Sequence, residues 1–110
     1  MMEFKLADGL LVVSPSGNLD SGNSQAFEEA LLVQMDGSIR GVVFDFSRLD
    51  YISSAGLRVI LRALKQFQTQ GLRFMLAGLN TTVREIFEIS GFLKYFKVFA
   101  TVGEALKSGA

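Results

Sequence analysis

A segment rich in hydroxyls and carboxylates follows the most continuous apolar strand candidate in the chain. Asp45 closes the apolar run at 42–44, and the pair Ser53 and Ser54 directly precedes a regular amphipathic pattern. The N-terminus of a helix has unpaired N–H groups and a partial positive charge, which together favour an anion. A phosphate on either serine would bring roughly −1.5 to −2 charges into that field. The pattern by itself favours simple N-capping by the serines, with a modified or contact serine as the functional alternative.

Three further residues near the serines also have a structural and a functional interpretation. Gly56 lies just inside the predicted helix, where glycine costs roughly 1 kcal/mol relative to alanine, so it indicates close approach by another group. Asp45 either orients hydroxyls or a metal at the site of Ser54, or binds backbone N–H groups of the adjoining loop. Asp20 is expected to cap the first predicted helix, and it could also face the loop that contains Ser54.

The residue types that are absent restrict the chemistry. The 110 residues contain no cysteine and no histidine, which excludes disulfides, thiolate nucleophiles, imidazole bases and the catalytic triads that depend on histidine. Eleven basic residues balance eleven acidic ones, so a field that would bind nucleic acid is not predicted. The apolar runs are far shorter than the ~20 residues of a membrane span, and no signal peptide is visible. We expect a cytoplasmic protein without cofactor, nucleic-acid partner or membrane insertion.

The spacing of apolar residues predicts one α/β domain over residues 1–110, in the order β-β-α-β-α-β-α-β-α. Asp8-Gly9 between two apolar runs predicts a hairpin, and Thr82 with Glu85 predicts a capping box at the start of the third helix. The predicted strands are 4–6, 10–13, 41–46, 73–77 and 95–99. The predicted helices are 21–35 with a stop at Gly37, the segment from the serine pair to Gly71, the segment from Thr82 to Gly91, and 102–107.

Two surface features are candidates for contact with a partner. Arg58, Arg62 and Lys65 recur on one side of the second predicted helix, where they form either a docking face or an ordinary solvated face. Three aromatic residues follow Gly91, and they either pack in the core or leave an exposed patch. These aromatic residues are Phe92, Tyr95 and Phe96.

The segment from Val43 to Arg58 resembles the STAS domain, and more narrowly the stand-alone anti-sigma factor antagonists of bacteria. It reads Val-Phe-Asp-Phe-Ser-Arg-Leu-Asp-Tyr-Ile-Ser-Ser-Ala-Gly-Leu-Arg. The resemblance extends to the opening hairpin, to residues 17–20 and to residues 89–92, and so covers essentially the whole chain. It implies the STAS fold, with a single mixed β-sheet, an N-terminal β-hairpin and about four helices packed mainly on one face.

The resemblance also implies a partner switch without catalytic activity of its own. In that family the unphosphorylated antagonist binds an anti-sigma factor, which is also a serine kinase, and so releases the kinase's target. Phosphorylation breaks the complex, and a metal-dependent serine phosphatase restores the antagonist. The acceptor position falls on Ser54, with Ser53 as second choice because many relatives carry Asp there. The resemblance implies a monomer or weak dimer, with partner contacts at Asp20, Asp45, Ser53, Gly56, Leu57 and Arg58.

Two other functional classes stay open at the level of sequence. One is a structural STAS subunit of a lipid-transport ATPase complex, in which Ser54 is a contact residue and no kinase is needed. The other is a small hydrolase or phosphotransfer domain that uses Asp45 and Asp50, with Asp45 as acceptor in the manner of a receiver domain. The absence of an acidic pair after the first core strand argues against this enzyme.

Overall fold

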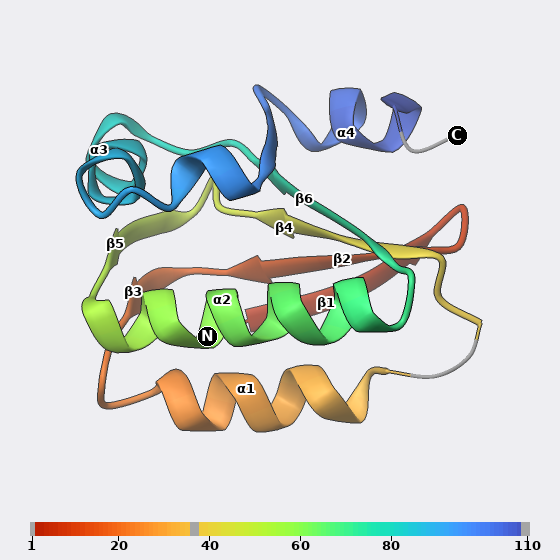
Figure 1. The fold of residues 1–110 in the computed structure, drawn as a ribbon, viewed down its shortest axis with the longest axis horizontal. Coiled ribbons are helices and arrows are strands. Elements are labelled where there is room, and N and C mark those ends of the chain that lie inside the picture. Colours follow the sequence, from red (N-terminus) through yellow and green to blue (C-terminus); the bar gives the residue numbers. More distant parts are fainter. Residues whose placement is uncertain (1, 36–37, 109–110) are drawn as a thin grey trace.

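Two β-sheets organise the computed structural model of the chain, which describes residues 2–35 and 38–108. The main sheet has the spatial order β1-β2-β4-β6-β7, and a small second sheet pairs β3 with β5 (Figure 1). The strands are β1 (Met2–Ala7), β2 (Leu10–Pro15), β3 (Gly17–Leu19), β4 (Gly41–Asp45), β5 (Leu49–Ile52), β6 (Arg73–Ala77) and β7 (Lys97–Phe99).

The predicted N-terminal hairpin is confirmed. Strands β1 and β2 are antiparallel, whereas every other neighbouring pair is parallel. Asp8 and Gly9 connect the hairpin with φ values of 55° and 80°, the positive values that match a tight turn to the twist of the two strands. The remaining strands of the main sheet are joined through helices, as parallel pairing requires.

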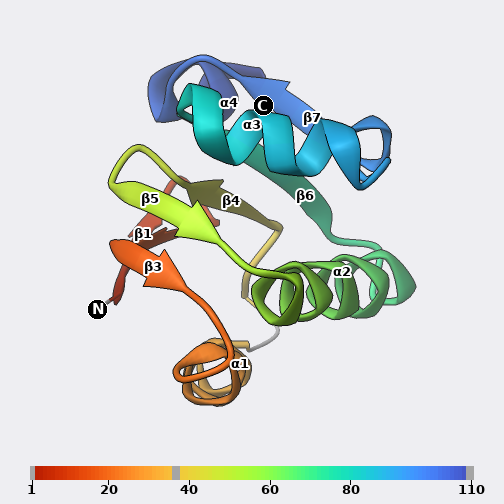
Figure 2. The same ribbon diagram turned by 90° about the vertical axis from the view of Figure 1, so that its left-hand side faces the viewer.

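Both faces of the main sheet are covered, although unequally. The helices are α1 (Ser24–Val33), α2 (Ser54–Thr69), α3 (Thr81–Ile89) and α4 (Val102–Ser108), with a short 3₁₀ turn η1 (Leu93–Tyr95) before β7. Helices α1, α2 and α3 contribute to one large core, whereas α4 packs in a smaller cluster on the opposite face (Figures 1 and 2). The four helices therefore lie mainly on one face, as the resemblance implied.

The middle of the sheet explains the apolar run that lacks alternation. In β4, Val42 and Phe44 enter the large core while Val43 enters the smaller cluster, and all three are fully buried. A strand buried on both faces has no solvent-facing position and therefore no polar alternation. Phe44 packs against the rings of Phe27 and Phe74, with centroids 6.1 and 4.9 Å away.

Short elements account for most differences from the predicted order. Strands β3 and β5 lie in segments predicted as loops, because each is only three or four residues long and pairs with the other across a long stretch of sequence. The last strand is confined to Lys97–Phe99, since residues 93–95 form the 3₁₀ turn. Helix α1 begins at Ser24 rather than at residue 21, and its predicted stop at Gly37 lies outside the described residues.

The predicted capping box at the start of α3 is wrong, because Asn80 takes the capping position. The Asn80 Oδ1 atom accepts a hydrogen bond from the Val83 N–H at 2.7 Å, and its Nδ2 group donates to the Leu49 carbonyl at 2.9 Å. One side chain thereby caps α3 and ties it to β5. Thr82 is the second residue of α3 and is exposed.

Replacement of Asn80 tests this assignment. We expect Asn80→Ala to lower the free energy of unfolding by about 1–2 kcal/mol, because it removes the cap and the bond to β5. The matched variant Thr82→Ala should change it by less than ~0.5 kcal/mol. Urea denaturation followed by circular dichroism measures both, and equal effects of the two substitutions would contradict the assignment.

Candidate functional site

The predicted serine pair lies where the two strands of the small sheet end. Strands β3 and β5 are parallel, with Leu19 opposite Ile52, so their carboxyl ends meet at one edge (Figure 2). The Ser53 N–H donates to the Leu19 carbonyl at 2.9 Å. This pairing places the segment after Leu19, which begins with Asp20, beside the start of α2. This pairing could not be predicted from sequence, because it joins two strands of three and four residues that lie far apart in the chain.

Ser53 is the N-cap of α2. Its backbone is extended, and its Oγ atom accepts a hydrogen bond from the Gly56 N–H at 3.3 Å. Its carbonyl accepts the first helical hydrogen bond, from the Leu57 N–H at 2.9 Å. Ser53 is also only partly exposed. Ser53 therefore has the capping role that was one of the two interpretations of the serine pair.

Ser54 is the first residue of α2, and its side chain takes no part in this network. The residue is exposed, and its hydroxyl forms no hydrogen bond within residues 2–35 and 38–108. The hydroxyl lies on the first turn of a 16-residue helix, where unpaired N–H groups and the helix dipole favour a negative charge. Ser54 thus has the exposure and the electrostatic surroundings that a phosphoacceptor needs.

Gly56 explains how α2 approaches the small sheet so closely. A Cβ atom at this position would lie 2.8 Å from both the Leu19 carbonyl oxygen and Ile52 Cγ1. The close approach predicted from sequence is therefore confirmed, and the group that approaches is the protein itself. Gly56 and Leu57 are both buried, so they help to position the first turn of α2. Arg58, one helical turn after Ser54, is exposed.

Asp20 belongs to a turn before α1 and is not its N-cap. Its Oδ1 atom accepts a hydrogen bond from the Gly22 N–H at 2.9 Å, and its own N–H donates to Asn23 Oδ1 at 2.9 Å. Asn23 occupies the N-cap position of α1 and donates through Nδ2 to the Asn18 carbonyl at 2.7 Å. The predicted cap is therefore wrong, but the half-buried Asp20 does lie at the sheet edge that holds the serines.

Asp45 lies on the other face of the main sheet, so the expectation that it faces Ser54 is wrong. Residues alternate along β4, and Asp45 shares its face with Val43, which packs in the cluster of α4. Its Oδ1 atom accepts from the Ser47 N–H at 3.0 Å and its Oδ2 atom from the Ser14 hydroxyl at 3.3 Å. The structural alternative, binding to a backbone N–H of the loop, is confirmed.

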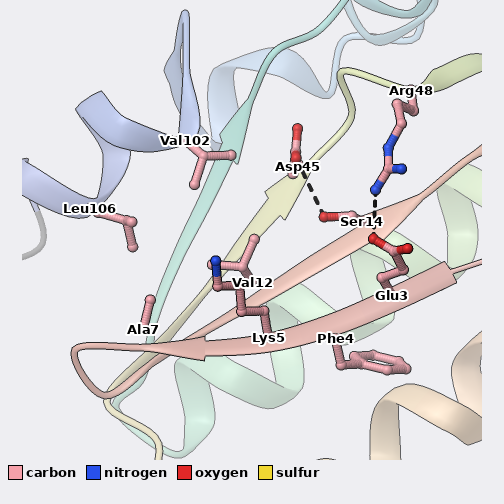
Figure 3. Close-up of a pocket in the computed structure, with 10 residues that line it drawn as sticks. All are labelled: Glu3, Phe4, Lys5, Ala7, Val12, Ser14, Asp45, Arg48, Val102 and Leu106. Atoms are coloured by element: carbon pink, nitrogen blue, oxygen red, sulfur yellow. Dashed lines mark hydrogen bonds and ion pairs between the residues drawn. The ribbon is translucent and has the colours of Figure 1, made fainter.

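The cavity beside Asp45 has a volume of about 620 Å³ and lies between the hairpin and α4 (Figure 3). An ion pair between Arg48 and Glu3, 2.7 Å apart, crosses its rim and raises the pKa of the Arg48 guanidinium. Within the described part of the chain, no three acidic side chains gather as metal ligands.

The basic side of α2 divides into paired and unpaired residues. Arg62 binds Glu28 of α1 through two hydrogen bonds of 2.8 and 2.9 Å. This contact lowers the pKa of Glu28 below its ordinary value and raises that of Arg62. Arg58 and Lys65 form no ion pair with the described residues. Arg62 thus links two helices, a role that sequence reasoning missed because Glu28 lies 34 residues away.

Comparison with known proteins identifies the family of this chain. The family model of the STAS domain matches residues 1–105. The chain belongs to the STAS domain family. The putative anti-sigma factor antagonist BtrV of Bordetella bronchiseptica is 50% identical over 92 residues, which cover 83% of this chain and 78% of BtrV. The anti-sigma-F factor antagonist RsfB of Mycobacterium tuberculosis is 28% identical over 99 residues, or 90% of this chain and 80% of RsfB.

Solved structures confirm the predicted STAS fold. A putative anti-sigma factor antagonist from Thermotoga maritima superposes with a TM-score of 0.91 at 22% identity, covering 97% of this STAS domain and 92% of that chain. The unphosphorylated form of the antagonist SpoIIAA gives a TM-score of 0.82 at 21% identity, covering 98% and 95%. The relatives are named as regulators, in agreement with the prediction that the chain is not an enzyme. No helix within residues 2–35 and 38–108 is both long and apolar enough to cross a membrane.

The contact at Gly56 predicts an unusual response to alanine. Gly56→Ala should lower the free energy of unfolding by about 1–3 kcal/mol, because the new methyl group meets backbone that cannot yield easily. Gly103→Ala in α4 is the matched control, since its Cβ would come no closer than 3.8 Å to Thr101 Oγ1. This control should be neutral or stabilising by up to ~1 kcal/mol. Thermal unfolding of the two variants decides the matter, and a neutral Gly56→Ala would refute the packing role.

The ion pair between α1 and α2 predicts a dependence of stability on pH. The pKa of Glu28 is lowered in the folded state, so the stabilisation is present at neutral pH and is lost as pH falls through that lowered pKa. Arg62→Met should therefore be less stable than the parent at pH 7, with the difference vanishing once Glu28 is protonated. Arg58→Met serves as the unpaired control. Urea denaturation from neutral to acidic pH measures the difference in the free energy of unfolding between Arg62→Met and the parent. A difference that stays constant at all pH values would contradict the prediction.

Proposed function

We propose that this STAS domain is an anti-sigma factor antagonist controlled by phosphorylation of Ser54. One observation carries the proposal, namely the exposed and unbonded hydroxyl of Ser54 at the N-terminus of α2. The similarity to BtrV and RsfB, both named as anti-sigma factor antagonists, supports the regulatory class. In this proposal the unphosphorylated domain binds an anti-sigma factor that is also a serine kinase, and the kinase's target is released.

The local structure gives Ser54 the advantage over Ser53 as acceptor. The Ser53 Oγ atom already accepts the capping hydrogen bond from the Gly56 N–H. A phosphate on this oxygen would alter the cap and with it the first turn of α2. Phosphate on Ser54 leaves the cap intact and places its negative charge near free helix N–H groups. The modified domain therefore stays folded, and the change acts on the surface alone.

The proposed switch acts through the cost of charge at an interface. The kinase transfers the γ-phosphoryl group of ATP to Ser54 Oγ, the hydroxyl proton is released, and ADP leaves. The new dianion must lose water if the same surface is to stay in contact with the kinase, and it repels nearby carboxylates. The complex then dissociates. Hydrolysis by a metal-dependent serine phosphatase returns Ser54 to its hydroxyl form, and we expect the domain to be a monomer or weak dimer throughout.

Phosphopeptide mapping of the protein purified from its own cells tests the acceptor. The parent and Ser53→Ala should both carry phosphate on Ser54, whereas Ser54→Ala should carry none. Ser53→Ala should also lose about 1 kcal/mol of stability through the lost cap, and Ser54→Ala should keep the stability of the parent. Phosphate on Ser53 alone would show that the acceptor is assigned wrongly, and the absence of phosphate under all growth conditions would overturn phosphorylation control.

Binding to the serine-kinase anti-sigma factor of the same cells completes the test. Ser54→Ala should bind it, and Ser54→Glu should lower the affinity by more than about tenfold. Ser47→Glu adds the same charge at an exposed serine of the loop after β4 and should bind like the parent. Isothermal titration measures all three variants. Equal binding by Ser54→Glu and Ser54→Ala would contradict the switch.

A further inference from the structure

A groove separates α2 from the segment that follows α3. One hollow of about 450 Å³ is lined by Leu61, Leu64, Lys65, Gln68, Phe92 and Tyr95. A second hollow of about 230 Å³ shares Leu64, Gln68 and Tyr95 with the first and continues to the start of β6 and β7. The two hollows therefore adjoin along one groove, and Leu64, Gln68 and Tyr95 border both of them.

The aromatic residues after Gly91 divide between the core and this groove. Phe96 is only 8% exposed, and its ring packs against those of Phe74 and Phe87 with centroids 5.4 and 5.7 Å away. Tyr95 is 55% exposed, and its ring lies tilted against that of the half-buried Phe92, with centroids 6.5 Å apart. Because Phe96 already fills the core position of this segment, the exposed ring of Tyr95 remains available to a partner.

The groove is basic although the chain is neutral. Lys65, Arg73 and Lys97 line it, and Lys94 Nζ lies 5.5 Å from the centre of the Tyr95 ring. These are four of the eleven basic residues in the chain. No acidic side chain of the described residues lines either hollow. An apolar floor with cations on its rim is complementary to an apolar side chain flanked by carboxylates.

We propose that this groove binds an acidic segment of a partner protein. An apolar side chain of that segment enters the larger hollow against Leu61, Phe92 and Tyr95, and its carboxylates meet Lys65 and Lys97. The apolar floor fits a protein side chain, whereas phosphate-backbone binding would need a wider positive field than a neutral chain provides. Along α2, Leu61, Lys65 and Gln68 follow Ser54 and Arg58 at spacings of three and four, so the groove continues the side of α2 on which Ser54 lies.

Photo-crosslinking of the full chain tests the groove directly. We would place p-benzoylphenylalanine at position 95 in the cells of origin, with position 6 as an exposed control, and sequence the crosslinked peptide. The captured peptide is then synthesised and its binding is measured by fluorescence anisotropy. We expect an acidic peptide whose affinity falls by about tenfold in Lys65→Glu and in Tyr95→Ala. Lys107→Glu and Leu6→Ala are the controls, because they make comparable changes elsewhere on the surface. Both should bind the peptide like the parent.

The alternative outcomes each overturn the proposal. A basic or neutral peptide, a second copy of this chain, a lipid adduct or no adduct at position 95 would show that the groove does not bind an acidic partner segment. The test is independent of the proposed switch, because Ser54→Ala and Ser54→Glu should bind the synthetic peptide equally. A loss in Ser54→Glu as large as that in Tyr95→Ala would assign the peptide to the Ser54 surface instead.

Discussion

The close contact between Gly56 and the end of β3 determines the geometry of the candidate site. Because position 56 has no Cβ atom, the first turn of α2 can lie directly on the Leu19 carbonyl and on Ile52. The parallel pairing of β3 with β5 brings these groups together. A larger residue would push the helix outward and move Ser54 away from the strand edge. The surface around Ser54 thus depends on the close backbone packing beneath it.

Two adjacent serines occupy different places in the first turn of α2. Ser53 satisfies a free N–H group of α2, while Ser54 is left exposed on the same turn. A cap that is independent of the proposed acceptor lets the helix stay formed whichever state Ser54 adopts. A phosphoryl group at this place is compatible with the helix dipole but costly in a protein interface. This combination allows a surface change without a change of fold.

The two faces of the main sheet carry different chemistry. One face holds the large aromatic core, which fixes α1, α2 and α3 and through them both the Ser54 surface and the basic groove. The other face holds α4 and the cavity with Asp45. The ion pair of Arg62 with Glu28 adds a polar link between α1 and α2. Both proposed surfaces therefore lie along α2, the helix that packs on this core.

Sequence alone was sufficient to predict the order of the main elements, the hairpin at Asp8-Gly9 and the buried character of β4. The reason is that periodicity and turn chemistry are local properties. The capping role of the serine pair and the close approach at Gly56 also followed from residue type and spacing. Tertiary structure alone decided which serine is the cap and which face Asp45 occupies. Both depend on pairings between distant strands, where a shift of one residue changes the face on which a side chain lies.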